Sequence, residues 1–295
     1  MEVKKMKKII TIRTLFILML TSALTFALLS CKSSAATTEE EPPAAPVAAA
    51  EPAPPAAPEK QPEPVVEQVD PALVAAETFF ISGNINYDRQ DYDKAIDDYS
   101  EAIRLYPNYT QAYYNRGLAH ANKGEMDEAI TDFNSAIRLN ANYDKAFYNR
   151  GIAYHAKGDL DSAIADYDQA IRLNPRYAYA YNNRGITYLE KDDPDNAIAD
   201  CSDAIRLDPD YDKAYYNRGL AYTTKGDLDK AIEDYDQAIS LNPNYGKAYT
   251  SRGAAYASQG DLNKAVADWE AALRLNSNDA EARNNLEWAR QEQGS

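Results

Sequence analysis

A unit of 34 residues occurs six times in succession between Ala76 and Asp279, and this repeat constrains the fold more than any other feature of the chain. One glycine of the unit recurs at a constant step, at Gly83, Gly117, Gly151, Gly185, Gly219 and Gly253. A fixed period of this length is typical of proteins that stack copies of one small motif, each packing on its neighbours. We therefore expect an extended array, and arrays of this kind usually serve as docking surfaces.

The residue pattern within one unit predicts two helices. In the first half, a large aromatic stands at the fourth place, the glycine at the eighth and, in the last four copies, a tyrosine at the eleventh, which puts all three on one helical stripe. A glycine followed by an acid, as in Gly158-Asp159, ends this helix and caps the next. The second half carries two alanines around an aromatic, so the two helices can approach closely. Four of the six units close with a proline, as in Leu173-Asn174-Pro175, which stops the second helix.

This pattern resembles the tetratricopeptide repeat over residues 76–279. The resemblance implies an all-α protein, a right-handed superhelical solenoid of six helix-turn-helix repeats. The expected repeats are residues 76–109, 110–143, 144–177, 178–211, 212–245 and 246–279, and residues 280–295 form a capping helix and tail. Departures from the family pattern are local: Asn86 and His120 replace the tyrosine, Cys201 replaces an aromatic, and Ala141 and Ser277 replace the closing proline.

The first 30 residues have the organisation of a bacterial lipoprotein signal peptide. Four lysines and an arginine precede an apolar run from Leu15 to Leu29 that is shorter than a membrane-spanning helix needs. The run ends at Leu28-Leu29-Ser30-Cys31, which resembles a lipobox. That resemblance implies cleavage before Cys31 and lipidation of this cysteine, and hence a membrane anchor in the bacterial cell envelope, at the outer membrane or periplasmic face. The alternative is an ordinary secreted protein.

Residues 31–75 are expected to form a tether between Cys31 and the repeats. Ten of the 15 prolines of the chain lie between Pro42 and Pro71, and alanine, glutamate and valine supply most of the remainder. A composition with so few large apolar side chains does not bury a core. A spacer is the favoured interpretation, and a proline-rich ligand for a partner domain is the alternative.

Net charge excludes some partners. The chain carries a formal charge of −15, and residues 1–30 are basic, so the part that follows them is more acidic still. Nucleic acids and anionic lipid surfaces are bound largely through basic side chains, so neither is an expected partner of the repeats. Only Cys201 remains once Cys31 is lipidated, so no internal disulfide is expected.

One departure from the family pattern runs through the array: the place before the glycine, usually leucine, is an arginine. These arginines are Arg116, Arg150, Arg184, Arg218 and Arg252. An aspartate recurs in every second helix, at Asp98, Asp132, Asp166, Asp200, Asp234 and Asp268. We predict a ladder of ion pairs between the helices of each repeat. A row of arginines that binds a ligand is the alternative.

The resemblance places peptide binding on the first helices, which line the inner groove of such solenoids. The candidate groove residues form an asparagine row, Asn115, Asn149, Asn183, Asn217 and Asn285, with flanking tyrosines Tyr114, Tyr148 and Tyr216 and lysines Lys145, Lys213 and Lys247. Amide side chains both donate and accept hydrogen bonds, so a regular row suits an extended peptide backbone. The alternative is that these residues are ordinary repeat surface. The clamp that chaperone-binding relatives use for a terminal carboxylate needs asparagine at the ninth place, where this chain has Leu118, Ile152, Ile186 and Leu220, so that mode is not expected.

Catalysis has little support in the sequence. The two histidines, His120 and His155, lie in different repeats, and we interpret His120 as a core residue and His155 as a surface residue. No phosphate-binding glycine loop, metal-ligand motif or calcium loop occurs, so no catalytic residue, metal or cofactor is expected.

These observations lead to three ranked functions. The first is an envelope lipoprotein that binds a protein or peptide in its groove as a scaffold or assembly factor. The second is a self-associating structural protein, in which Phe79, Phe80 and Ile81 leave the N-terminal end of the array open while a polar cap closes the other end. An enzyme is the weakest of the three.

Overall fold

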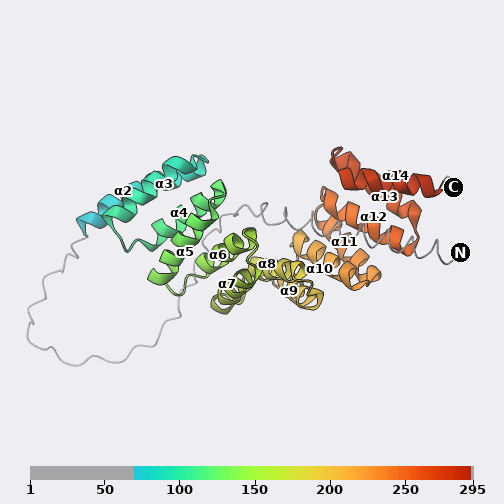
Figure 1. The fold of residues 1–295 in the computed structure, drawn as a ribbon, viewed down its shortest axis with the longest axis horizontal. Coiled ribbons are helices and arrows are strands. Elements are labelled where there is room, and N and C mark those ends of the chain that lie inside the picture. The colour runs from blue at the N-terminus through green and yellow to red at the C-terminus, as the bar shows by residue number, and fades with distance from the viewer. Residues whose placement is uncertain (1–69, 294–295) are drawn as a thin grey trace, which may run out of the picture.

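The computed structural model describes residues 70–293, and within them the chain is a stack of helices (Figure 1). The helices are α2 (Pro71–Asp88), α3 (Tyr92–Leu105), α4 (Thr110–Lys123), α5 (Met126–Leu139), α6 (Asp144–Ala156), α7 (Leu160–Leu173), α8 (Ala178–Glu190), α9 (Pro194–Leu207), α10 (Asp212–Lys225), α11 (Leu228–Leu241), α12 (Gly246–Gln259), α13 (Leu262–Leu275) and α14 (Ala280–Gln293). They form six successive antiparallel pairs followed by α14, which packs on α13. The predicted all-α solenoid with a C-terminal capping helix is confirmed.

Helix α2 is longer than the first helices of the later repeats. It begins at Pro71 rather than at Ala76, with Asp70 as its N-cap and a proline in its first turn. A proline there is tolerated because its missing N–H would have no partner within the helix. Residues 71–75, which were predicted to belong to the tether, are part of α2, and residues 31–69 of the predicted tether, like residues 1–30, lie outside the described residues.

The turns between the two helices of a repeat follow from the Gly-acid pairs. Gly124, Gly158, Gly226 and Gly260 have φ values from 79° to 90°, the left-handed conformation that ends a helix. Asp159 and Asp261 then cap the next helix by accepting hydrogen bonds from the N–H groups of Ser162 and Lys264. Two repeats without this glycine use Gln90 and Asp192 in the same conformation, at φ 63° and 59°.

Each repeat packs the aromatic side chain of its second helix against the glycine of its first. A β-carbon built on Gly151 would stand 2.8 Å from the Tyr167 ring, and one on Gly219 would stand 2.6 Å from the Tyr235 ring. Only glycine therefore lets the two helices approach this closely. In the fourth repeat the smaller Cys201 takes the place of the ring, and its side chain is fully buried.

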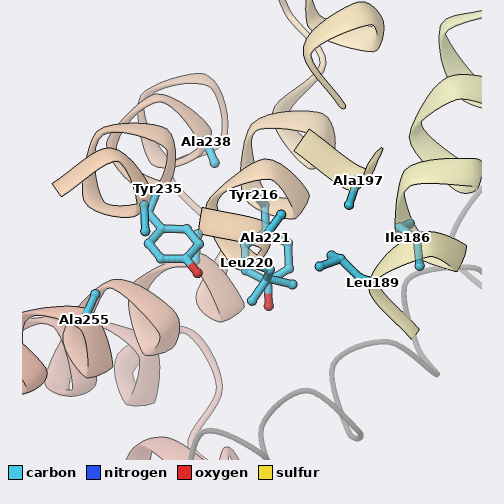
Figure 2. Close-up of a cluster of buried hydrophobic side chains, with 11 residues drawn as sticks. Ile186, Leu189, Ala197, Tyr216, Leu220, Ala221, Tyr235, Ala238 and Ala255 are labelled. Atoms are coloured by element: carbon cyan, nitrogen blue, oxygen red, sulfur yellow. The ribbon is translucent and has the colours of Figure 1, made fainter. Parts of the chain in front are cut away.

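The core continues from repeat to repeat. Alanines of one second helix and of the next first helix pack together, as in the pairs Ala102 with Ala112 and Ala204 with Ala214. Apolar residues of α8 to α12 form one shared cluster, in which side chains such as Leu189, Leu220 and Tyr235 come from different helices (Figure 2). The array is thus one continuous stack in which neighbouring repeats support each other.

The first helices form the inner wall of the stack. Each first helix contacts the next one directly, from α2 with α4 to α12 with α14, whereas successive second helices do not pack together to a comparable extent between Pro71 and Gln293. Residues at one place of the repeat consequently recur along the inner wall. In that same range, no helix has the length and apolar character needed to cross a membrane.

Candidate functional site

The predicted arginine–aspartate ladder is present in repeats two to six. Each arginine donates two hydrogen bonds to the aspartate of its own repeat, with Nε–Oδ2 distances of 2.7–2.8 Å and Nη2–Oδ1 distances of 2.6–2.7 Å. The aspartate side chains are 4–9% exposed and the arginine side chains 17–21% exposed. This paired geometry and burial identify the ladder as a structural element rather than a row of ligand-binding arginines.

The third nitrogen of each arginine makes a contact that the sequence did not predict. The Nη1 atom reaches a polar side chain of the preceding second helix, which is Ser100, Asn134, Asp168, Ser202 or Asp236 in successive repeats. Every arginine also lies over the aromatic ring three residues before it, with 5.4–5.7 Å from Cζ to the ring centre. One side chain therefore joins three helices from two repeats.

The electrostatics of Arg184 show how the two neighbouring aspartates keep its guanidinium charged. Burial alone would lower the pKa of its guanidinium, but its hydrogen bonds to Asp200 and Asp168, together with their negative charge, raise that pKa above its usual value. Arg184 thus stays charged, as a buried ion pair requires.

The first repeat has no arginine in the ladder. Ser82 stands at that place, and its hydroxyl donates to Asp98 over 2.7 Å, as does the Asn86 amide. Two neutral donors therefore replace the guanidinium. Asn86, one of the departures from the family pattern, is one of these two donors.

The asparagine row joins neighbouring repeats. Asn149 Nδ2 donates to the Tyr114 hydroxyl of the preceding repeat, and Asn183 Nδ2 donates in the same way to Tyr148, both over 3.0 Å. Asn217 makes the equivalent bond to Asn182 Oδ1 over 2.8 Å, because the fourth repeat has asparagine where its neighbours have tyrosine.

The ends of the row follow from the residue available in the preceding repeat. Phe80 offers no hydroxyl, so Asn115 Nδ2 instead donates to Asn84 Oδ1 over 2.8 Å. At the other end, the preceding repeat has Thr250, whose hydroxyl bonds to Gly246 and Asp279, and the buried Asn285 Nδ2 has no hydrogen-bond partner among residues 70–293.

The asparagine row also has a structural role that the sequence did not predict. The Nδ2 groups of Asn115, Asn149, Asn183 and Asn217 are already engaged between repeats, and Asn183, Asn217 and Asn285 are only 1–3% exposed. The sequence correctly suggested a regular row but did not show that the row connects the repeats. Peptide binding by these residues stays a prediction.

The predicted tyrosines belong largely to the core. Tyr114, Tyr148 and Tyr216 each pack on the ring of a later tyrosine in the same repeat, with ring centres 4.7–4.9 Å apart. Tyr148 is 7% and Tyr216 is 2% exposed. Their main contribution is to packing and to the bonds between repeats.

The predicted lysines occupy the second place of their repeats. Lys145 is exposed, whereas Lys213 and Lys247 are half-buried. The fourth repeat has Tyr179 at this place, 43% exposed, in a T-shaped pair with the Tyr211 ring at 5.1 Å between centres. Sequence analysis missed Tyr179, although an aromatic residue in a lysine register was a visible signal.

The C-terminal end of the inner wall carries closely spaced charges. Burial raises the pKa of Glu281 to about 7; the charge of Asp279 adds to this effect and Lys247 opposes it. Burial likewise lowers the pKa of the Lys247 amine. The lysine row therefore ends beside a carboxyl group that titrates near neutral pH.

The two histidines differ from expectation in one respect. His120 is partly buried beside Glu125, with 2.7 Å between Nδ1 and Oε2. His155, predicted to lie on the surface, is buried at 7% exposure, and its Nε2 lies 3.2 Å from Glu190 Oε1. That prediction was wrong because the His155 side chain lies beside Glu190 of α8, the first helix of the next repeat. Over residues 70–293 no three His, Cys, Asp or Glu side chains are placed to hold a metal ion.

Helix pairs that stack along a continuous inner wall define a helical-repeat scaffold, a class of protein that binds other proteins. Family models of the tetratricopeptide repeat match residues 178–211, 212–245 and 234–267, and those of the TPR repeat match 83–124, 122–158, 153–192 and 253–294. The chain belongs to the tetratricopeptide repeat family.

Solved structures with the same fold include three that are informative. One chain of the APC/C hetero-tetramer Cut9-Hcn1 superposes with a TM-score of 0.63 at 21% identity, over 72% of this chain and 42% of that one. MamA gives 0.52 at 32% identity, over 56% of this chain and 96% of MamA. YrrB, described as a TPR protein with an unusual peptide-binding site, gives 0.53 at 19% identity, over 63% and 96%. A search of the curated proteins found no match to the sequence.

Proposed function

We propose that this protein is a scaffold of the bacterial cell envelope that binds an extended segment of another protein along its inner wall. The observation that carries this proposal is the direct contact of successive first helices, which brings one register of side chains into a continuous row. Along that row, the exposed Lys145 and Tyr179 offer a positive charge and an aromatic surface. Tyrosine suits a binding surface because it combines a large apolar ring with a polar tip.

The charge of the protein supports an acidic or neutral partner segment at this wall. The chain is strongly acidic, with a net charge of −15, yet Lys145, Lys213 and Lys247 share one register of the inner wall. A segment with carboxylate groups would gain from these lysines and be repelled elsewhere on the surface. The carboxamide oxygens of Asn115 and Asn149, which are partly exposed, add acceptors for the N–H groups of such a segment.

Affinity capture from detergent-solubilised envelopes tests this proposal. We compare the native chain with a variant carrying Lys145→Glu and Tyr179→Ala, and with a matched control, Arg172→Glu, on the exposed side of α7. A partner retained by the native chain and the control but lost from the inner-wall variant supports the proposal. Equal capture by all three chains contradicts it.

We further propose that Cys31 anchors the protein to the membrane through lipid. The basic start, the short apolar run and the Leu-Leu-Ser-Cys sequence support this proposal. Several acyl chains hold a protein on a membrane far more firmly than one. Replacing Cys31 with alanine is expected to move the protein from the membrane to the soluble fraction. Membrane retention of the Cys31→Ala variant would contradict lipid anchoring at this residue.

A further inference from the structure

The outward face of α2 carries an apolar stripe without a covering helix among residues 70–293. Val74, Ile81 and Ile85 are 49%, 58% and 47% exposed, and Thr78 lies between them on the same face. These residues make up much of the exposed large apolar surface of the described chain. Figure 1 shows α2 at one end of the array and α14 at the other. An exposed apolar stripe at the end of a stack is typical of a contact surface.

In later repeats, equivalent places face the preceding repeat. The third place is a fully buried alanine in each, Ala112, Ala146, Ala180, Ala214 and Ala248, and the tenth is Ala119, Ala153, Thr187, Ala221 and Ala255, each at most 1% exposed. In α2 these places are Thr78 and Ile85. The stripe thus occupies the places through which each later first helix contacts the preceding repeat. Its larger side chains prevent another repeat from packing as closely against α2.

Head-to-tail stacking of a second copy is disfavoured at the other end as well. The outward residues of α14 include the exposed side chains of Arg283, Asn284, Glu287 and Arg290. Packing this polar face on the α2 stripe would desolvate charges opposite apolar groups. A partner with its own apolar stripe fits better.

The spacing of the residues in the stripe suits packing against the same stripe of a second copy. Val74, Thr78, Ile81 and Ile85 are separated by 4, 3 and 4 residues, the spacing of a seam between two packed helices. When two α2 helices lie antiparallel about a two-fold axis, Val74 of one copy stands opposite Ile85 of the other, and Thr78 stands opposite Ile81. We propose that the protein forms a two-fold dimer through this antiparallel contact of α2 helices.

The charges at the ends of α2 support the same register. Asp70 caps the N-terminus and Arg89 follows the C-terminus, and both are exposed. In the antiparallel pair, Asp70 of each copy stands opposite Arg89 of the other, so each apolar seam ends in opposite charges. A two-fold contact uses one self-complementary surface and closes at two copies. The contact is short compared with stable interfaces of roughly 1,200–2,000 Å², so the dimer is weak and depends on concentration.

Cysteine cross-linking of the full chain in mild detergent tests this arrangement. In a Cys31→Ser background, differently tagged chains carrying Thr78→Cys or Ile81→Cys are mixed and oxidised. Cys201 is fully buried and contributes no cross-link. The proposal predicts a disulfide-linked pair of the two tags in clear excess over either homodimer, at least about tenfold above the background from chains carrying Leu275→Cys, which is 42% exposed on α13.

A second change tests the seam itself. Ile85→Glu, added to both chains, places a carboxylate opposite Val74 and is expected to lower the mixed cross-link about tenfold or more without loss of helix content, because residue 85 is exposed in the single chain. Leu275→Glu is the matched control and should have no effect. Mixed cross-linking at background level, an excess of homodimers, or an unchanged yield with Ile85→Glu would each overturn the proposal.

Discussion

Arg218 holds Asp234 through two parallel hydrogen bonds of 2.8 and 2.7 Å, and its third nitrogen donates to Ser202 in the preceding repeat over 3.0 Å. Arg184 makes the same two bonds to Asp200, but its third partner is the negatively charged Asp168. The array therefore contains two otherwise matched forms of one three-helix contact. Their comparison separates the effect of the ion pair from the effect of the second carboxylate.

Asp234→Ala is expected to destabilise the protein more than Asp200→Ala. Loss of either aspartate leaves a largely buried arginine, which costs ~3–5 kcal/mol when its charge loses its only counterion. Arg184 retains the carboxylate of Asp168, whereas the remaining hydrogen-bond partner of Arg218 is the neutral Ser202, so the cost should be smaller in the fourth repeat. Denaturant unfolding of both variants measures the difference. An equal cost at both sites would show that the second carboxylate contributes nothing.

A double-mutant cycle on Arg184 and Asp200 should reveal strong coupling. Replacing Arg184 with methionine and Asp200 with leucine together removes both charges, so the pair should cost less free energy of unfolding than the sum of the single changes. Additive single and double variants would reject the ion pair as an energetic unit.

The bond between Asn183 and Tyr148 should contribute to stability independently of any partner. Asn183→Ala removes a buried donor across the repeat boundary and is expected to cost about 1 kcal/mol. Native-state hydrogen exchange of α6 and α8 locates this loss. Unchanged protection of both helices would show that the asparagine row has no connecting role.

The close approach of the two helices of a repeat at its glycine predicts a repeat-specific response to an added methyl group. Gly219→Ala places a β-carbon 2.6 Å from the Tyr235 ring and should cost ~1–3 kcal/mol through overpacking. Gly185→Ala meets Cys201 Sγ at 2.9 Å instead, so combining it with Cys201→Ala should relieve most of its cost. Thermal unfolding compares the variants, and similar melting temperatures for Gly219→Ala and the native chain would contradict this packing.

The capping helix should be less stable above neutral pH. Burial raises the pKa of Glu281 to about 7, above its usual value of 4.5, so the folded state binds this proton more tightly than the unfolded state. The stabilising contribution is therefore complete below pH 4.5 and is lost as the pH rises through about 7. Hydrogen-exchange protection factors of α14 measure this loss. Glu281→Gln should remove the pH dependence, and a variant that keeps it would exclude Glu281 as its source.

The fold could be predicted well from the sequence because every repeat carries the same helix-forming, turn and packing residues. The glycine step, the turn residues and the alanines determine helix pairs that need only their neighbours, and the matching Arg and Asp registers predicted the ladder. Contacts between repeats were harder to predict. Nothing in the sequence alone shows that Asn183 donates a hydrogen bond to Tyr148 across the repeat boundary, or that His155 is buried. Both depend on the rotation of one repeat against the next.

The candidate site was predicted less completely for the same physical reason. Periodicity identified the helices of the inner wall but could not separate exposed Lys145 from half-buried Lys213 at the same place. Periodicity also identifies only residues that recur, so it did not indicate Tyr179, which interrupts the lysine register. The apolar N-terminal end of the array was only partly anticipated: Phe79 and Ile81 are exposed as expected, whereas Phe80 packs against Tyr99 and Tyr109.

Photo-cross-linking of the full chain in living cells tests the central claim most directly. A photo-reactive amino acid is introduced at Lys145 or Tyr179 on the inner wall, or at Ala165 or Arg172 on the exposed side of α7. If the inner wall binds an extended protein segment, the two inner positions will yield the same cross-linked partner and the two outer positions will not. A partner captured equally from both sides, or only from α7, would contradict binding along the inner wall.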